Sequence, residues 1–402
     1  MNTEIKHISL SRAGSSLSKY DDRHLSSFYN ASLCSATQDD MGYKTPRNQF
    51  TFITPSRFFS VIRNSVVLVS LFNCFLYPQY RDIPDVVTKV ATATANWLKI
   101  ETGVRAIGMG GAFVAAGTGV SAIPYNPSGV GFLTKSEAYY SKSNFLAGIS
   151  HNVLGYGQKL SSQDFVGVHL FYLNSGKMEV TNEWFPNGTG EEFSVISMSL
   201  RGTYARRLTD RLKVGMSLNY LRDQLFKTVT MQGVSFDIGS NFDTGIYGML
   251  LGMSITNFGP EVSYGGAGLH RTVPDTIDVD ERLSRVTKDF PLPLTFRLGV
   301  KNDVIGKDSE FIVSEGHRLT LAVDGINAID YTVYGSMGME YGYREFGFVR
   351  AGMRMGHDTA GMSAGGGLRY PLNKGLTLLV DYAFVDYGIL EQTHQFSISV
   401  EF

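Results

Sequence analysis

The chain has 402 residues, of which 44 are glycine, 12% are aromatic and 18% are charged, and its formal net charge is −1. A charge balance near zero argues against a nucleic-acid-binding protein, and the apolar content is too low for a bundle of membrane-spanning helices. Both cysteines, Cys34 and Cys74, precede residue 80, so no disulfide and no Cys-based zinc site is expected beyond it.

The N-terminal part has the layout of a leader. Residues 1–56 are polar at first and rich in serine, and we expect a disordered extension or a mis-assigned start, with Met41 as one candidate for the true start. Arg57 and Arg63 then precede an apolar run at 66–76, which predicts a signal peptide over residues 57–79. A lipoprotein signal at Cys74 and a buried core helix are the alternatives.

A glycine-rich stretch follows within residues 80–135, where we also expect a short N-terminal helix. It reads ANWLKIETGVRAIGMGGAFVAAGTGVSAIPYNPSGVGFL from Ala95 to Leu133. The Gly-Met-Gly-Gly run does not predict a phosphate-binding loop, because no Lys-Ser/Thr follows it and no βαβ pattern surrounds it. Glycines of this density instead suit a backbone that needs positive φ and close approach to other backbones.

Residues 136–402 alternate between apolar and polar side chains, as membrane-crossing strands do. At the C-terminus, Phe396, Ile398 and Phe402 fall on one face, and Ser397 and Ser399 on the other. We count about fourteen such segments of roughly nine to eleven residues, the length that crosses a bilayer as a tilted strand. The fold class predicted is an all-β membrane protein, an antiparallel transmembrane β-barrel of about 14 strands; a soluble sandwich is the alternative.

Charges within these strands favour the barrel. Arg354, Arg369, Asp381 and Glu401 lie inside strand patterns, which suits a wet lumen and does not suit a dry sandwich core. The connections also divide into two classes, with the C-terminus taken as the periplasmic end. The short periplasmic turns are expected at 161–162, 208–210, 242–245, 343–345 and 371–374, with a longer one at 303–315. The longest connections, 177–192 and 259–290, are expected on the opposite side.

Several motifs resemble those of one outer-membrane family. Leu98 to Ile100, Arg105 to Ala112 and Ala122 to Gly129 resemble the N-terminal signature of the PorV/PorQ family, which is in turn similar to the FadL family of hydrophobic-compound transporters. Ser128 stands where that signature has Ala. The resemblance continues through LPLTFRLGV, LTLAVDGINAIDYTVYGSMGMEY, VRAGMRMG, AGGGLRY and DYAFVDYG in the barrel region.

The resemblance implies a FadL-like barrel of fourteen strands with the N-terminal segment folded inside as a plug. We expect Pro127 to fix a turn beside Asn126, and Arg105 to pair with a lumenal carboxylate, with Asp324, Asp381 or Glu401 as candidates. The residues assigned to the plug motif are Arg105, Gly108, Met109, Gly110, Gly111, Asn126, Pro127 and Gly129.

Two functions follow from the resemblance, and neither is enzymatic. The main expectation is a component of type IX protein secretion that binds the translocon and escorts secreted substrate proteins at the cell surface. The alternative is a FadL-like transporter of long-chain fatty acids or other hydrophobic solutes. For the first, the aromatic residues Trp184, Phe185 and Tyr264 in the long loops are candidates for partner binding, and Phe402 ends a strand that resembles the signal read by the barrel-assembly machinery.

No catalytic residue, cofactor or nucleic-acid partner is expected, and the environment of the barrel is outer-membrane lipid in a bacterial cell. Neither G-x-S-x-G nor H-E-x-x-H occurs, and the histidines are scattered without ligand spacing. Asp275, Asp278, Asp280 and Glu281 could bind Ca²⁺ through carboxylate oxygens. A solvated acidic loop is the favoured interpretation, because the spacing lacks the glycine and the bidentate glutamate of an EF-hand.

Overall fold

The computed structural model describes residues 92–402 other than 227, 270, 274–280, 284–286, 359, 360 and 374. The extension and signal peptide predicted for residues 1–79 lie outside the described residues and remain predictions. The side chains of the proposed calcium site, Asp275 to Glu281, lie outside them as well. No helix in the described part of the chain is long and apolar enough to cross a membrane.

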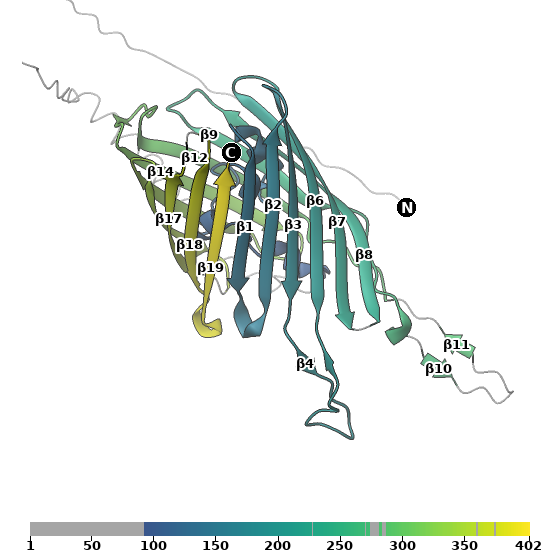
Figure 1. Cartoon of the computed structure of the whole chain (residues 1–402). Helices are drawn as coiled ribbons and strands as arrows, with labels where there is room; N and C mark the ends of the chain where they lie inside the picture. Colours follow the sequence, from purple (N-terminus) through teal and green to yellow (C-terminus); the bar gives the residue numbers. More distant parts are fainter. Residues whose placement is uncertain are drawn as a thin grey trace, which may run out of the picture. The chain divides into compact units, whose positions relative to one another are not determined.

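Fourteen antiparallel strands close into a barrel (Figure 1). Closure is complete because β12 pairs with β9 as well as β14, and β19 pairs with β1 as well as β18. The predicted fold class is therefore confirmed. The strands are β1 (Glu137–Asn144), β2 (Ser150–Lys159), β3 (Asp164–Asn174), β6 (Ile196–Arg207), β7 (Leu212–Phe226), β8 (Val229–Asp243), β9 (Leu250–Phe258), β12 (Thr295–Gly306), β14 (His317–Ala328), β15 (Tyr334–Tyr343), β16 (Gly347–Met355), β17 (Met362–Pro371), β18 (Thr377–Asp386) and β19 (Gln392–Glu401).

Short strands occur in three of the connections. β13 (Ile312–Val313) runs parallel to the end of β12. β4 (Met178–Glu179) pairs with β5 (Glu192–Phe193), and β10 (Arg271–Val273) pairs with β11 (Glu281–Leu283). The last barrel strand before the longest connection, β9, is shorter than β8, and the register of the pair shifts between Phe236 and Ile238.

The two faces of the strands differ as the alternation predicts. In β19, Phe396 and Ile398 are exposed, whereas Gln395, Ser397 and Ser399 are buried. A closed barrel with an outer belt of exposed apolar side chains and a polar inner face is the architecture of bacterial outer-membrane proteins, and the bilayer covers such a belt. Members of the belt include Leu154, Val168, Leu200, Met216, Leu218, Ile238, Leu298, Leu321, Val349 and Ile398.

The connections occupy the two ends as expected. The turns after β2, β6, β8, β15 and β17, with the longer one after β12, lie at the end that carries Phe402, because each strand before them runs toward that end. The connection between β3 and β6 extends well beyond the opposite rim as the β4–β5 hairpin (Figure 1). We refer to the Phe402 end as periplasmic and the other as extracellular.

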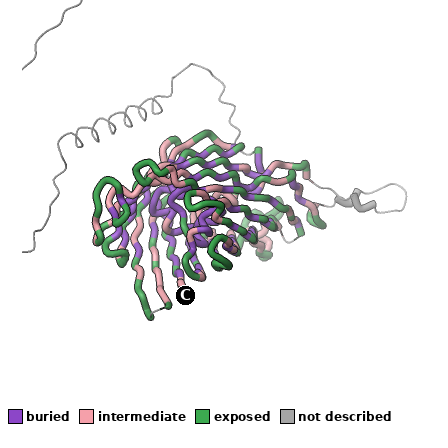
Figure 2. Tube along the Cα trace, turned by 90° about the horizontal axis from the view of Figure 1, so that it is seen from above, coloured by how far each residue is buried: buried purple, intermediate pink, exposed green. Residues whose placement is uncertain are grey.

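The segment from Ala93 to Leu133 lies inside the barrel and is its plug. It contains four short helices: η1 (Asn96–Lys99), α2 (Val104–Gly108), η2 (Val120–Ala122) and η3 (Pro127–Phe132). Figure 2 shows this part of the trace as mostly buried, within the ring of strands. Two more 3-10 turns, η4 (Leu146–Gly148) and η6 (Gly388–Leu390), lie in extracellular connections, and η5 (Ala267–Leu269) lies in the longest one.

Candidate functional site

Glycine residues let the backbone of the plug lie directly against the barrel wall on both sides of the lumen. At its Gly-Met-Gly-Gly motif, Gly110 and Gly111 have φ of 67° and 85°, a conformation that side chains disfavour. A Cβ on Gly110 would lie 2.6 Å from the backbone nitrogen of Met353 in β16. Three inward glycines of β15, β16 and β17 receive the motif, and a Cβ on any of them would meet the backbone of Gly108, Met109 or Gly110. They are Gly338, Gly352 and Gly365.

The second contact lies on the opposite wall, around Asn126 and Pro127. The Asn126 carboxamide accepts a hydrogen bond from the Ser128 amide and donates to Val114 O (2.8 Å) and to Ser240 O of β8 (3.0 Å). Pro127 begins η3, and a Cβ on Gly215 of β7 would touch its backbone. Gly129 leaves no room for a side chain, because a Cβ there would lie 2.5 Å from that of Ala122.

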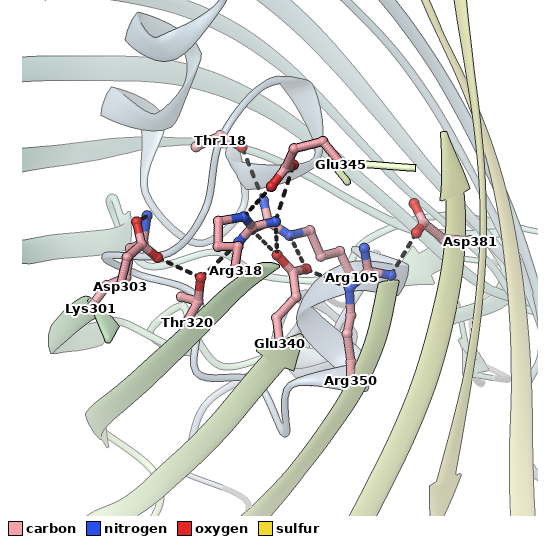
Figure 3. Close-up of polar contacts among 10 residues, drawn as sticks. All are labelled: Arg105, Thr118, Lys301, Asp303, Arg318, Thr320, Glu340, Glu345, Arg350 and Asp381. Atoms are coloured by element: carbon pink, nitrogen blue, oxygen red, sulfur yellow. Dashed lines mark hydrogen bonds and ion pairs between the residues drawn. The ribbon is translucent and has the colours of Figure 1, made fainter. Parts of the chain in front are cut away.

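A buried ion-pair network holds Arg105 (Figure 3). Its guanidinium donates to Glu340 of β15 at 2.7 and 2.9 Å. Arg318 and Arg350 reach the same carboxylate at 2.9 and 2.6 Å, and Arg350 also contacts Asp381 at 2.6 Å. The predicted partners of Arg105 were therefore wrong. Glu340 takes their place because it faces inward from β15, within reach of Arg105. The three predicted carboxylates have other partners: Asp381 pairs with Arg350, Asp324 accepts hydrogen bonds from the Phe113 and Val114 amides, and Glu401 pairs with Arg369.

Two further ion pairs join the plug to the same wall. Glu101 pairs with Arg354 of β16 at 2.5 Å, and Lys99 pairs with Asp330, in the connection after β14, at 2.7 Å. With Arg105, these contacts place the charged side chains of residues 99–105 along β14, β15 and β16. Among the described residues, the ion pairs between plug and wall thus lie on this side of the lumen.

The other side of the lumen carries apolar clusters beside buried polar side chains. We call two groups of buried side chains there the wall cluster and the mouth cluster. The wall cluster comprises Val120, Ile123, Val130, Leu133, Tyr139, Val153, Phe165, Phe171, Leu173 and Ala205. The mouth cluster comprises Ala95, Leu221, Val229, Met231, Val262, Tyr264 and Leu292. Trp97 packs against both clusters and stacks on Phe171 with ring centroids 5.7 Å apart.

Tyr264 does not lie where the sequence placed it. The predicted exposed loop aromatic is only 7% exposed and belongs to the mouth cluster. The segment around Val262 and Tyr264 enters the barrel mouth, where the inward side chains Leu221 and Met231 offer it an apolar surface. The hydroxyl donates to Asp223 at 2.7 Å and contacts Thr94 at 3.0 Å. Burial, reinforced by the Asp223 carboxylate, raises the pKa of Tyr264 above its usual range, so the hydroxyl keeps its proton.

Trp184 and Phe185 are exposed, at 84% and 59%, at the tip of the β4–β5 hairpin. The tip is ordered by the Asn182 carboxamide, which accepts hydrogen bonds from the amides of both residues. At the base of the hairpin, Phe193 packs on Phe226 of β7, with ring centroids 5.1 Å apart. The C-terminal residue, Phe402, exchanges two backbone hydrogen bonds with Ser136, of 2.9 and 3.0 Å.

Sequence reasoning missed Glu340 and the glycines of the barrel wall. Their signal was present, because Gly215, Gly338, Gly352 and Gly365 all stand at inward positions of alternating strands. Such glycines weaken a strand unless another backbone approaches closely. Among the described residues, no group of His, Cys, Asp and Glu side chains is arranged to hold a metal ion.

Comparison with known proteins gives structural matches only. No protein-family model matches the chain, and no curated protein matches it, so the PorV/PorQ resemblance rests on its motifs alone. Among solved structures, the chain is similar to the CymD monoaromatic hydrocarbon channel (13% identity, 74% of this chain and 96% of that one, TM-score 0.47). It is also similar to the Pseudomonas putida toluene transporter TodX (13% identity, 74% of this chain and 96% of that one, TM-score 0.46). A third match is a Pseudomonas aeruginosa FadL homologue (13% identity, 74% of this chain and 97% of that one, TM-score 0.47).

Proposed function

We propose that the protein is a non-enzymatic transporter of apolar solutes across the outer membrane. The observation that carries the proposal is the pair of apolar clusters inside the lumen, with Trp97 between them. The lumen of a general porin is polar and filled with water. Here, inward positions of β2, β3, β7 and β8 hold Val153, Phe171, Leu221 and Met231 instead. A sheltered apolar surface with few polar groups is the usual form of a site for an apolar ligand.

The arrangement of the plug supports the same function. Its ion pairs and the Gly108–Gly111 contact bind it to β14–β17, whereas apolar contacts dominate along the β1–β3 wall and at the mouth. An apolar solute competes with apolar contacts without having to separate buried charges, which would cost several kcal/mol. The path of such a solute is therefore expected along the wall and mouth clusters.

Uptake tests this proposal. Cells that lack their own hydrophobic-solute transporters would express the protein, and the initial uptake of a labelled long-chain fatty acid and of toluene would be measured, with a small sugar as the hydrophilic control. We expect faster uptake of at least one apolar compound and no change for the sugar. Equal uptake of all three compounds with and without the protein would contradict transport.

The secretion function is the second candidate, favoured by the β4–β5 hairpin. Trp184 and Phe185 project beyond the barrel on an acidic arm with four glutamates and one lysine between 177 and 192, and exposed aromatic residues commonly anchor protein partners. Replacement of both residues by Ala is expected to abolish capture of a secreted substrate protein in a pull-down from cells, with Met178→Ala at the base of the arm as the control. Undiminished capture by the double variant would remove this candidate. We favour transport over secretion because Tyr264, the third aromatic residue expected to bind a partner protein, is buried and cannot contact one.

A further inference from the structure

A row of buried polar side chains crosses the lumenal face of β3, β6, β7 and β8. His169 of β3 lies opposite Arg201 of β6, Arg201 opposite Asn219 of β7, and Asn219 opposite Ser235 of β8. Ser199 and Asp237 adjoin the row on the same face, and all six side chains are at most 4% exposed. We call these six residues the polar row.

Several groups of the polar row have no hydrogen-bond partner among the described residues. They are both ring nitrogens of His169, the Ser199 hydroxyl, Arg201 Nε and the Asn219 carbonyl oxygen. In folded proteins about 90% or more of buried polar groups are paired, and each unpaired one costs about 1–3 kcal/mol. These neighbouring donors and acceptors can therefore take up hydrogen bonds from another molecule.

The charges of the polar row compensate each other. Arg201 Nε lies 3.5 Å from Asp237 Oδ2, and Asp237 also accepts hydrogen bonds from the Asn219 carboxamide (2.9 Å) and the Asn257 amide (2.7 Å). The next charges along the wall, Arg297 and Asp324, are also opposite in sign. Since Asp237 already balances the charge of Arg201, a bound carboxylate would add a second negative charge to this patch, and burying an uncompensated charge is costly. A hydrocarbon would leave the donors and acceptors unsatisfied.

Apolar side chains continue the same faces toward the outside. On β3, His169 is followed by Phe171 and Leu173, and on β7, Asn219 is followed by Leu221. The polar row therefore lies on the periplasmic side of Phe171, Leu173 and Leu221, while Phe165 and Ala205 of the wall cluster lie farther toward the periplasm than the row. A molecule with a polar head on the row would leave its apolar tail among these side chains.

We propose that the polar row is the head-group site of the transported solute, and that this solute is a neutral amphiphile whose head is a hydroxyl or carbonyl group. The inference rests on the proposed transport of apolar solutes and narrows its substrate class. The hydroxyl or carbonyl would exchange hydrogen bonds with His169, Ser199 and Asn219, which offer both donors and acceptors.

Binding can be followed through Trp97, which stacks on Phe171. The described part of the chain has a second tryptophan, Trp184, so the Trp184→Phe variant in lipid vesicles leaves Trp97 as the reporter. Its fluorescence would be titrated with dodecanol, dodecane and dodecanoate, with each affinity expressed per mole fraction in the bilayer. We expect dodecanol to bind about tenfold more tightly than either of the others, the order given by one buried hydrogen bond.

Two variants of the row and one matched control complete the test. His169→Phe and Ser199→Ala are expected to reduce the affinity for dodecanol to that for dodecane. Ser363→Ala removes another buried, unpaired hydroxyl, on the opposite wall in β17, and is expected to change nothing. Neither row variant removes a charge, so folding is expected to be retained, and heat modifiability on a gel checks it.

The outcomes separate the two proposals. If dodecanoate binds most tightly, the proposal of a neutral head group is wrong. If all three probes bind equally, or if both row variants keep the preference for dodecanol, water alone completes the polar row and the proposed head-group site is wrong. Transport of apolar solutes would stand in each of these cases if dodecane binds and is taken up. If no probe binds and none is taken up, the proposed function itself fails.

Discussion

Arg105 of the plug and Glu340 of β15 share two hydrogen bonds, of 2.7 and 2.9 Å, deep in the lumen. Three guanidinium groups converge on this one carboxylate, since Arg318 and Arg350 also contact it. The carboxylate is almost inaccessible, so its charge is stable only while these partners remain in place. The network therefore ties α2, which packs against β16–β18, to β15 through Arg105. The plug surface that faces the wall and mouth clusters is the part without such an ion pair among the described residues.

Removing the charge of Glu340 is expected to loosen the plug. Glu340→Gln leaves Arg105 without a carboxylate partner, while Arg318 keeps Glu345 and Arg350 keeps Asp381. Loss of one partner from a buried network costs about 3–5 kcal/mol. Urea unfolding in lipid vesicles measures the change. Glu345→Gln is the control, because Glu345 pairs with Arg318 at the exposed rim, where an ion pair contributes about 1 kcal/mol or less. Equal losses in the two variants would contradict the role of Glu340 as the anchor of the plug.

A methyl group on the wall is expected to displace the plug. Gly352→Ala places a Cβ against the backbone of Met109 and Gly110, and overpacking of this kind costs about 1–3 kcal/mol. Gly202→Ala is the matched control, since a Cβ on Gly202 of β6 meets open space. Single-channel conductance in planar bilayers is expected to rise for Gly352→Ala alone. A closed, unchanged barrel in that variant would mean that the plug does not depend on this contact.

The outer face of β19 tests the position of the bilayer. Ile398→Arg is expected to cost roughly 2–4 kcal/mol because it places a charge against lipid near the middle of the membrane, whereas Gln392→Arg at the end of the same face should cost about 0–1 kcal/mol. Refolding into liposomes gives both values. Ser397 and Ser399 are not suitable as neutral lumenal controls, because both are buried next to the plug. Similar costs at 392 and 398 would contradict the assigned depth.

Deletion of Phe402 is expected to reduce insertion into the outer membrane without changing synthesis or export. Its backbone closes the last ladder position with Ser136, and its ring lies beside Tyr156, with centroids 6.5 Å apart. Immunoblots of fractionated cells would measure the change, with deletion of the plug segment 108–129 as a comparison that is expected to insert normally. Normal outer-membrane levels of the chain without Phe402 would refute the assembly signal.

The sequence predicted the barrel well because strand alternation is a local property. In β19 each side chain from Gln395 to Ser399 lies on the face that its polarity indicates. The assignment of short turns to one end of the barrel and of the longest connections to the other was also predicted, since the length of each connection can be counted in the sequence. The plug came from a resemblance in the Arg105–Gly129 region rather than from periodicity, which a segment without regular structure lacks.

The contacts between plug and wall could not be predicted, because they join residues far apart in the chain, 114 positions for Asn126 and Ser240 and 235 for Arg105 and Glu340. Arg105 had several inward carboxylates to choose from, and the choice of Glu340 depends on the depth at which α2 lies in the lumen. Tyr264 was misplaced for a similar reason. An aromatic residue in a long loop looks exposed until the inward Leu221 and Met231 of neighbouring strands are seen to form an apolar surface beneath it.

Uptake by a mouth-cluster variant tests the transport account most directly. Met231→Asp introduces a charge beneath Tyr264 in the mouth cluster, whereas the control Met253→Asp introduces one on the exposed outer face of β9. Both variants would be compared with the unaltered protein at equal levels in the outer membrane. The account predicts that initial uptake of the apolar compound falls to the level of cells without the protein for Met231→Asp and is retained by any inserted Met253→Asp protein. Unchanged uptake by Met231→Asp would contradict passage of the solute through the mouth cluster.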